Sequence, residues 1–153
     1  MKRLTIFLVF SFIYGSLITP EDGATLNHIH VLFEWEQIPE AEFYQIQISD
    51  DSGFTNPIIY TDDNTLAYIE KDALDWNSTY HRRTRPVLTS GSSGSWTDPF
   101  SFTTGSSLSS TTTTIIDESQ NQSGVTVFGA FFNYFSAAVD QTGKEIWNSG
   151  DND

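Results

Sequence analysis

Residues 29–48, IHVLFEWEQIPEAEFYQIQI, decide the fold. Apolar side chains recur there at every second position, in two runs separated by Pro39. The runs are Ile29, Val31, Phe33 and Trp35, then Tyr44, Ile46 and Ile48. Side chains two residues apart point to the same face of a strand, so each run predicts a β-strand with one buried face. We expect the Trp35 side chain to fill the centre of the core between the two sheets.

Short apolar segments of strand length continue on both sides of this stretch, from residue 17 to residue 104. Turn-forming clusters separate them, at residues 19–23, 50–53, 62–64 and 91–94. No long helical period interrupts the pattern. About seven short strands at this spacing predict an all-β fold of two antiparallel sheets packed face to face.

Several motifs in this region together resemble a fibronectin type III domain, of the variant common in secreted bacterial proteins. They are Pro20-x-x-Gly23, Phe33-x-Trp35, Ala41-x-x-Tyr44-x-Ile46-x-Ile48, Gly94-Ser95-Trp96-Thr97 and Phe100-x-Phe102-Thr103-Thr104. Leu74 followed by Tyr80 is similar to the family's tyrosine corner, where the phenol hydroxyl ties a crossing connection to the main chain. The resemblance covers residues 17–104 and implies an antiparallel immunoglobulin-like β-sandwich.

The first 16 residues predict a signal peptide. Lys2 and Arg3 precede a mostly apolar run over residues 4–14, and the small residues Gly15 and Ser16 follow it. That run is too short to span a bilayer comfortably. We therefore expect cleavage near residue 15 or 16 and a secreted, periplasmic or cell-surface protein. The alternatives are a buried N-terminal strand or an uncleaved anchor.

Composition excludes several classes of function. The 153 residues include 20 acidic and 7 basic side chains, for a net charge of −13, and no cysteine. Such a surface repels phosphate backbones and anionic lipid headgroups, so we expect neither nucleic-acid binding nor membrane binding after signal cleavage. Without cysteine there is no disulfide, no cysteine-based zinc site, no thiol nucleophile and no lipoprotein anchor.

The strand expected from Tyr80 to Leu88 carries an unusual run of arginines. If Tyr80 faces the core, alternation places Arg82 on the same buried face and Arg83 and Arg85 on the outer face. A buried, unpaired guanidinium is costly, so Arg82 must reach an edge, find a carboxylate or reflect a shift of register. We expect the arginines to pair with the abundant aspartates and glutamates. The alternative is a binding stripe for an anionic ligand.

Two histidines form a weak candidate metal site. His28 and His30 have the spacing of zinc or copper ligands on one strand face. Only Glu34 and Glu36 follow as possible further ligands, and exposed strand histidines without a metal are far commoner. We therefore predict no metal site.

Other candidates for chemistry are weaker still. The aspartate pairs at 50–51 and 62–63 lack the ligand spacing of a calcium loop, so turn formation is their default role. Asn77 and Asn121 begin glycosylation-type triplets, which arise often by chance. A nucleophile elbow and a phosphate-binding loop are both missing from the sequence. We predict no catalytic residue and no cofactor.

The last third of the chain changes character. Residues 105–124 have the Ser/Thr-rich composition of a linker, and an aromatic-rich stretch opens at Val125. Residues 137–147 then read as strand, turn and strand, the turn ending at Gly143. An isolated hairpin is marginal in water, and this one carries many aromatics, so we expect it to need a partner surface.

The piece Ala138-Val-Asp140-x-x-Gly143-x-x-x-Trp147 resembles a repeat of β-propellers. Its setting resembles the opening strands of arylsulfotransferase-like propellers, which in some secreted bacterial forms follow a fibronectin-like module. A propeller needs roughly 4–8 blades. The resemblance implies that residues 125–153 are the truncated start of a second β domain, with the catalytic residues beyond Asp153.

Three functions follow as hypotheses. The first is a non-catalytic accessory, spacer or protein-interaction module of a larger secreted enzyme, with the downstream domain of the same polypeptide as its partner. The second is an adhesion or glycan-binding module with Trp76 or Trp96 as its platform, unless both are partly buried. The third is a fragment of an arylsulfotransferase-like enzyme, inactive by itself.

Overall fold

The computed structural model describes residues 15–109, 114, 116–117, 119–120, 122–129 and 136–150. All the regular structure in these residues is β-strand, which confirms the all-β prediction for them. No helix long and apolar enough to cross a membrane occurs in this part of the chain. The apolar run of the predicted signal peptide lies outside the described residues.

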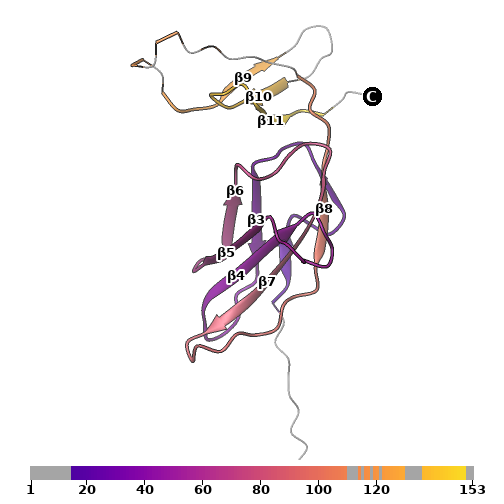
Figure 1. Cartoon of the computed structure of the whole chain (residues 1–153), viewed down its shortest axis with the longest axis vertical. Coiled ribbons are helices and arrows are strands. Elements are labelled where there is room, and N and C mark those ends of the chain that lie inside the picture. The colour runs from indigo at the N-terminus through magenta and orange to yellow at the C-terminus, as the bar shows by residue number, and fades with distance from the viewer. Residues whose placement is uncertain are drawn as a thin grey trace, which may run out of the picture.

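Two sheets account for the strands between residues 17 and 104 (Figure 1). The first is antiparallel and runs in the order β1 (Leu17–Thr19), β3 (Val31–Trp35) and β6 (Ala67–Glu70). The second has five strands in the order β2 (Ala24–Leu26), β8 (Phe100–Thr104), β7 (Thr79–Leu88), β4 (Ala41–Ser49) and β5 (Ile59–Asp63). Only the short β2 is parallel to its neighbour, β8. This arrangement is consistent with the predicted β-sandwich.

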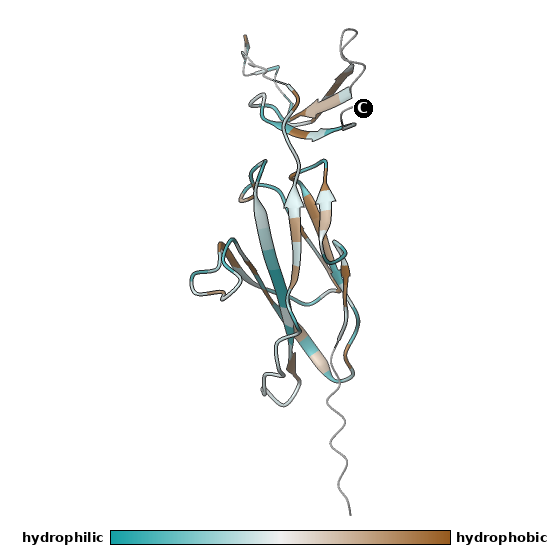
Figure 2. Cartoon of the chain, turned by 90° about the vertical axis from the view of Figure 1, so that its right-hand side faces the viewer, coloured by the Kyte–Doolittle hydropathy of each residue, from teal (hydrophilic) through white to brown (hydrophobic). Residues whose placement is uncertain are grey.

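The core lies between these sheets and is built from the alternating residues. Hydrophobic and hydrophilic residues are interspersed along the strands (Figure 2). Trp35 is 2% exposed, and its ring lies 5.6 Å from that of Tyr44, centre to centre. Phe33 and Phe102 meet edge to face at 5.6 Å. Both alternating runs of the sequence thus bury the predicted face.

Tyrosine hydroxyls tie two connections to the sandwich. The Tyr80 hydroxyl accepts a hydrogen bond from the Asp75 N–H at 2.9 Å, next to the fully buried Leu74. The Tyr44 hydroxyl accepts one from the Ile38 N–H at 2.7 Å. The predicted tie between Tyr80 and the main chain is therefore present.

Arg82 adopts none of the three arrangements expected from the sequence. Its side chain is 1% exposed and keeps the regular register of β7 with β4. The guanidinium donates to the Pro20 carbonyl oxygen at 2.6 Å and to the Glu34 carbonyl oxygen at 3.2 Å. It also lies within 5.7 Å of the ring centres of Phe33 and Phe100. Burial lowers the pKa of Arg82 to about 10, so the side chain stays charged at neutral pH.

A third, antiparallel sheet follows at one end of the sandwich, in the order β11-β10-β9 (Figure 1). Its strands are β9 (Thr126–Gly129), β10 (Ser136–Val139) and β11 (Glu145–Asn148). The turn between β10 and β11 is closed by a hydrogen bond from the Asp140 N–H to the Lys144 carbonyl oxygen, and Gly143 has φ 87°. The predicted hairpin is confirmed, with β9 added as a third strand. The phenylalanines between β9 and β10 lie outside the described residues.

Candidate functional site

Two surfaces gather the polar and aromatic groups that could carry a function. The first is the junction, where β11 meets residues 27–29, 74–76 and 106–109. The second is the arginine–aromatic face, made by Phe54, Tyr60, Arg83, Arg85 and Trp96 on the outer side of the five-stranded sheet.

Main-chain hydrogen bonds join the junction at the outer edge of β11. The Ile29 N–H donates to the Ile146 carbonyl oxygen at 3.0 Å, and the Asn148 N–H donates to the Asn27 carbonyl oxygen at 2.9 Å. The Asn27 side-chain amide also donates to the Asn148 carbonyl oxygen at 2.7 Å. A short segment of the sandwich thus occupies the position of a fourth strand beside β11.

Side chains from the connection before β7 reach the same strand. The Trp76 indole N–H donates to the Glu145 carbonyl oxygen at 2.8 Å. Lys144 lies 3.3 Å from both the Leu74 carbonyl oxygen and the Asp75 carboxylate. Trp76 is therefore a junction residue and half-buried, so it is not the open platform that one hypothesis required.

The Glu145 carboxylate is the polar centre of the junction. Its side chain is 4% exposed and accepts hydrogen bonds from the N–H groups of Leu108, at 3.0 Å, and Ser109, at 2.6 Å. The Ser109 hydroxyl and the Asn148 amide, the latter at 2.7 Å, donate to it as well. Burial alone would raise the pKa of Glu145, but these donors outweigh it and lower that pKa. An ionised carboxylate therefore fixes the start of the predicted linker.

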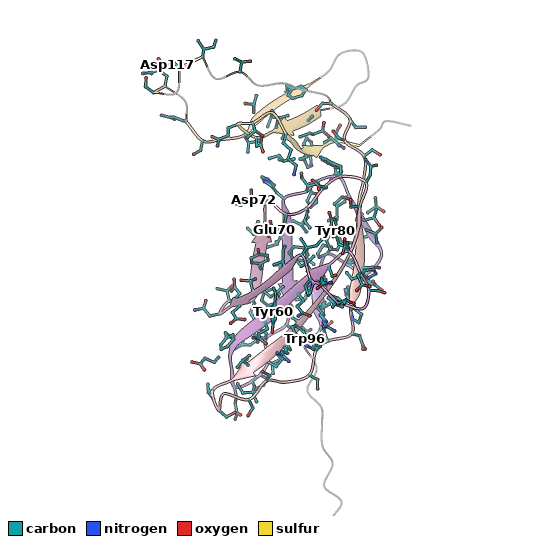
Figure 3. All side chains as sticks on the ribbon, in the orientation of Figure 1. Tyr60, Glu70, Asp72, Tyr80, Trp96 and Asp117 are labelled. Carbon is teal, nitrogen blue, oxygen red and sulfur yellow. The ribbon has the colours of Figure 1, made fainter. Side chains whose placement is uncertain are left out.

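The arginine–aromatic face alternates guanidinium groups with rings. The Arg83 guanidinium lies 4.1 Å from the ring centre of Phe54 and 4.6 Å from that of Trp96. Arg85 also lies 4.6 Å from the Trp96 ring. Tyr60 meets Trp96 edge-on at 6.3 Å, and both are labelled over the five-stranded sheet in Figure 3. Stacked contacts of this kind hold a guanidinium in a fixed plane.

Amide side chains of β4 hold the same two arginines. Arg83 Nε donates to Gln47 Oε1 at 2.8 Å, and Arg85 Nε donates to Gln45 Oε1 at 2.7 Å. The Tyr60 hydroxyl donates to the same Gln45 oxygen at 3.3 Å. Arg85 Nη2 also lies 3.5 Å from the Tyr60 hydroxyl, so Arg85 donates two hydrogen bonds within this face and Arg83 donates one. Each guanidinium keeps its remaining N–H groups for other acceptors.

The predicted pairing of these arginines with carboxylates is wrong. Among the described residues, the one ion pair within 4.0 Å joins Lys144 and Asp75. Burial, and then the nearby charge of Arg85, lower the pKa of Arg83. The physical reason for the difference is local: β4 offers glutamines opposite Arg83 and Arg85, and the indole of Trp96 fills the remaining space.

A glycine lets Trp96 reach this position. The Gly94 N–H donates to the Pro86 carbonyl oxygen at 2.8 Å, and the Thr97 N–H donates to the Thr84 carbonyl oxygen at 2.9 Å. A Cβ at Gly94 would lie only 2.7 Å from Pro86 Cγ, which belongs to a rigid ring. The connection between β7 and β8 therefore lies flat on β7 only because residue 94 has no side chain.

The two histidines occupy a different place from the one expected. Both precede β3, and His28 forms an antiparallel bridge with Trp147 at the junction. Burial, and then the charge of His30, lower the pKa of His28. No group of three potential metal-binding side chains occurs in the part of the chain that the structure describes.

The aspartate pairs build turns. Asp51 accepts hydrogen bonds from the N–H groups of Gly53 and Thr55, both at 3.0 Å, and Asp63 accepts one from the Thr65 N–H at 2.7 Å. Asn77 is exposed, with φ 56°, in the connection before β7. Asn121 lies outside the described residues.

Sequence reasoning missed the residues that matter most at both surfaces. Glu145 and Asn148 lie in a short strand like many others. Apart from the bond between them, the partners that join them to the rest of the junction are 36 or more residues away in the chain. Gln45 and Gln47 are the polar positions of an alternating strand, and nothing in their sequence context indicates that they hold arginines. No local pattern marks such long-range partners.

Neither a protein-family model nor a curated protein matches the chain. Among solved structures, the chain is similar to a Streptomyces avermitilis α-L-rhamnosidase, in its crystal structure with L-rhamnose. The two share 15% identity with a TM-score of 0.44, over 77% of this chain and 12% of the enzyme. That likeness is too low to carry an argument about fold or activity.

Proposed function

We propose that this chain is a non-catalytic, exported accessory module, in which a fibronectin type III-like sandwich holds the β9–β11 sheet in a fixed orientation. The junction is the observation that carries this proposal. The strand order supports the family assignment, since β1-β3-β6 faces β5-β4-β7-β8, as does the tie between Tyr80 and the main chain.

A Ser/Thr-rich linker alone would leave two β units free to move. Here β11 contacts the sandwich at residues 27–29 and at Trp76, and Glu145 of the same strand also holds the start of the linker at residues 108–109. Ala138 and Ile146 also belong to the same apolar cluster as the sandwich core. Contacts at several points restrict rotation as well as separation, so the sandwich is suited to the role of an oriented spacer.

The absence of cysteine allows a direct test of this orientation. We would place spin labels at Ser90→Cys, in the turn after β7, and at Gln141→Cys, in the turn before β11. Both positions are exposed. Double electron–electron resonance should then give one narrow distance distribution.

Glu145→Ala in the doubly labelled chain should broaden that distribution, because it removes the acceptor that fixes the linker. Glu42→Ala, an exposed glutamate on β4, is the matched control and should leave it narrow. A broad distribution in the parent chain would contradict an oriented spacer.

Export is a separate part of the proposal and rests on residues 1–16. Expression of the whole chain in a bacterial host should yield an extracytoplasmic product. Its intact mass should lack the first 15 or 16 residues. A full-length mass in the cytoplasmic or membrane fraction would overturn this part.

A further inference from the structure

We propose that the arginine–aromatic face binds an acidic sugar, with Arg83 and Arg85 taking the carboxylate and the neighbouring hollow taking hydroxyl groups. This binding activity is independent of the spacer role, because the face comes from β5, β7 and the connections that carry Phe54 and Trp96, and includes no junction residue.

The charge distribution is the first support. Three of the seven basic side chains of the sequence lie in β7, in a protein of net charge −13. Arg83 and Arg85 point to the outer face, and no carboxylate among the described residues lies within 4.0 Å of either guanidinium. Two like charges held beside one indole favour an anion between or above them.

The hollow beside these arginines has a different chemistry. It is a shallow hollow, open to solvent, of about 500 Å³, and is lined by Gln45, Tyr60, Thr61 and Asp62. Its groups are an amide, a phenol, an alcohol and a carboxylate, and Tyr60 is 55% exposed. A carboxylate repels an anion but accepts hydrogen bonds from hydroxyl groups. The hollow is thus suited to a neutral, hydroxyl-rich part of a ligand.

A sugar acid combines both requirements in one small molecule. Its carboxylate matches the planar N–H groups of an arginine, and its hydroxyls match the polar groups of the hollow. Its ring can lie against the exposed Tyr60, whereas Trp96 is half-buried under Arg83 and Arg85. An acidic peptide offers carboxylates but few hydroxyls for the hollow. A dense polyanion would meet the long-range repulsion of the −13 charge.

The test compares two probes on the full chain: trigalacturonate and its fully methyl-esterified, uncharged counterpart. Binding would be followed by NMR titration of backbone amides. The acid should shift amides of β4, β5 and β7, and should bind at least about tenfold more tightly than the ester, as expected for loss of charge-assisted hydrogen bonds.

Arg85→Gln should weaken binding of the acid by about tenfold or more and leave the ester nearly unchanged. Tyr60→Ala should weaken both probes. Lys71→Gln is the matched control, because it removes one exposed positive charge outside the face. The amide spectrum and thermal midpoint of each variant report whether it is folded.

Three results would overturn the proposal. The first is equal binding of acid and ester, and the second is loss of binding in Lys71→Gln as large as in Arg85→Gln. The third is binding of hexaglutamate, but not of trigalacturonate, at this face, which would assign it to acidic peptides.

Discussion

The sandwich and the β9–β11 sheet are stabilised in different ways. The sandwich buries its own apolar core, including Phe33 and Trp35 at 1–2% exposure. The smaller sheet adds Ala138 and Ile146 to that core, while Val127 on its outer strand is 67% exposed. Three short strands are marginal by themselves. The sheet therefore depends on its polar contacts with the sandwich, and the sandwich does not depend on the sheet.

This asymmetry implies an order of opening. Elements with few buried apolar contacts open at lower free energy than the global unfolding of the domain. The β9–β11 sheet should detach first and leave the sandwich folded. Substitutions in the sandwich core should instead unfold both units, since the sheet loses its partner surface.

The largest expected effect is at Trp35. Trp35→Ala should destabilise the sandwich by about 3–5 kcal/mol, because it leaves a large cavity between the sheets. Against a total stability of about 5–15 kcal/mol, that loss should abolish the cooperative transition at modest denaturant concentration. Urea unfolding followed by tryptophan fluorescence and circular dichroism measures it.

Trp35→Phe is the matched control. The indole N–H of Trp35 is buried and has no acceptor among the described residues, so its removal costs no hydrogen bond. This variant should lose much less stability than Trp35→Ala. Equal losses for both variants would mean that the N–H, rather than the packed volume, matters at this position.

The next largest effect is at Glu145 and is confined to the sheet. Glu145→Ala leaves donors from Leu108, Ser109 and the buried Asn148 without their acceptor, which should cost about 2–3 kcal/mol. Hydrogen exchange should speed up in β10 and β11 and stay slow in β3 and β4. Faster exchange in all strands would contradict the separation of the two units.

The sandwich could be predicted from the sequence because its determinants are local and periodic. The alternating residues of β3 and β4 indicate which face is buried, and Tyr80 indicates the connection that its hydroxyl binds at Asp75. The junction could not be predicted, because Glu145 acts on main-chain groups 36 residues away or more. The environment of Arg83 and Arg85 depends on the path of the connection that places Trp96 over β7. The alternation of apolar and polar residues in the sequence does not predict that path.

Acid should weaken the junction before it unfolds the sandwich. Burial lowers the pKa of His28 in the folded protein below its ordinary 6.5. The unfolded chain therefore binds the proton first, and the folded junction loses stability as pH falls below 6.5. The pKa of Glu145 is also below its ordinary 4.5, so its contribution is present above 4.5 and lost as pH falls through the folded-state pKa. Both groups act in the same direction.

Hydrogen exchange of β11 amides, corrected for the intrinsic rate, should therefore report weaker protection at pH 4 than at pH 7. Glu145→Gln should remove the part of this loss that occurs below pH 4.5, and His28→Gln the part that begins below pH 6.5. A junction that becomes better protected on acidification would contradict the proposed roles of both residues.

The smallest effect should come from the indole of Trp76. Trp76→Phe keeps an aromatic ring against the core and removes the one hydrogen bond to the Glu145 carbonyl oxygen, so it should cost about 1 kcal/mol. The cost should appear as a small rise in exchange within β11, with the urea midpoint of the sandwich unchanged. If Trp76→Phe opened the sheet as fully as Glu145→Ala, the indole rather than the carboxylate would be its main attachment. The sheet would then be held mainly by an aromatic side chain, as the sandwich core is, and the contrast between the two regions would be lost.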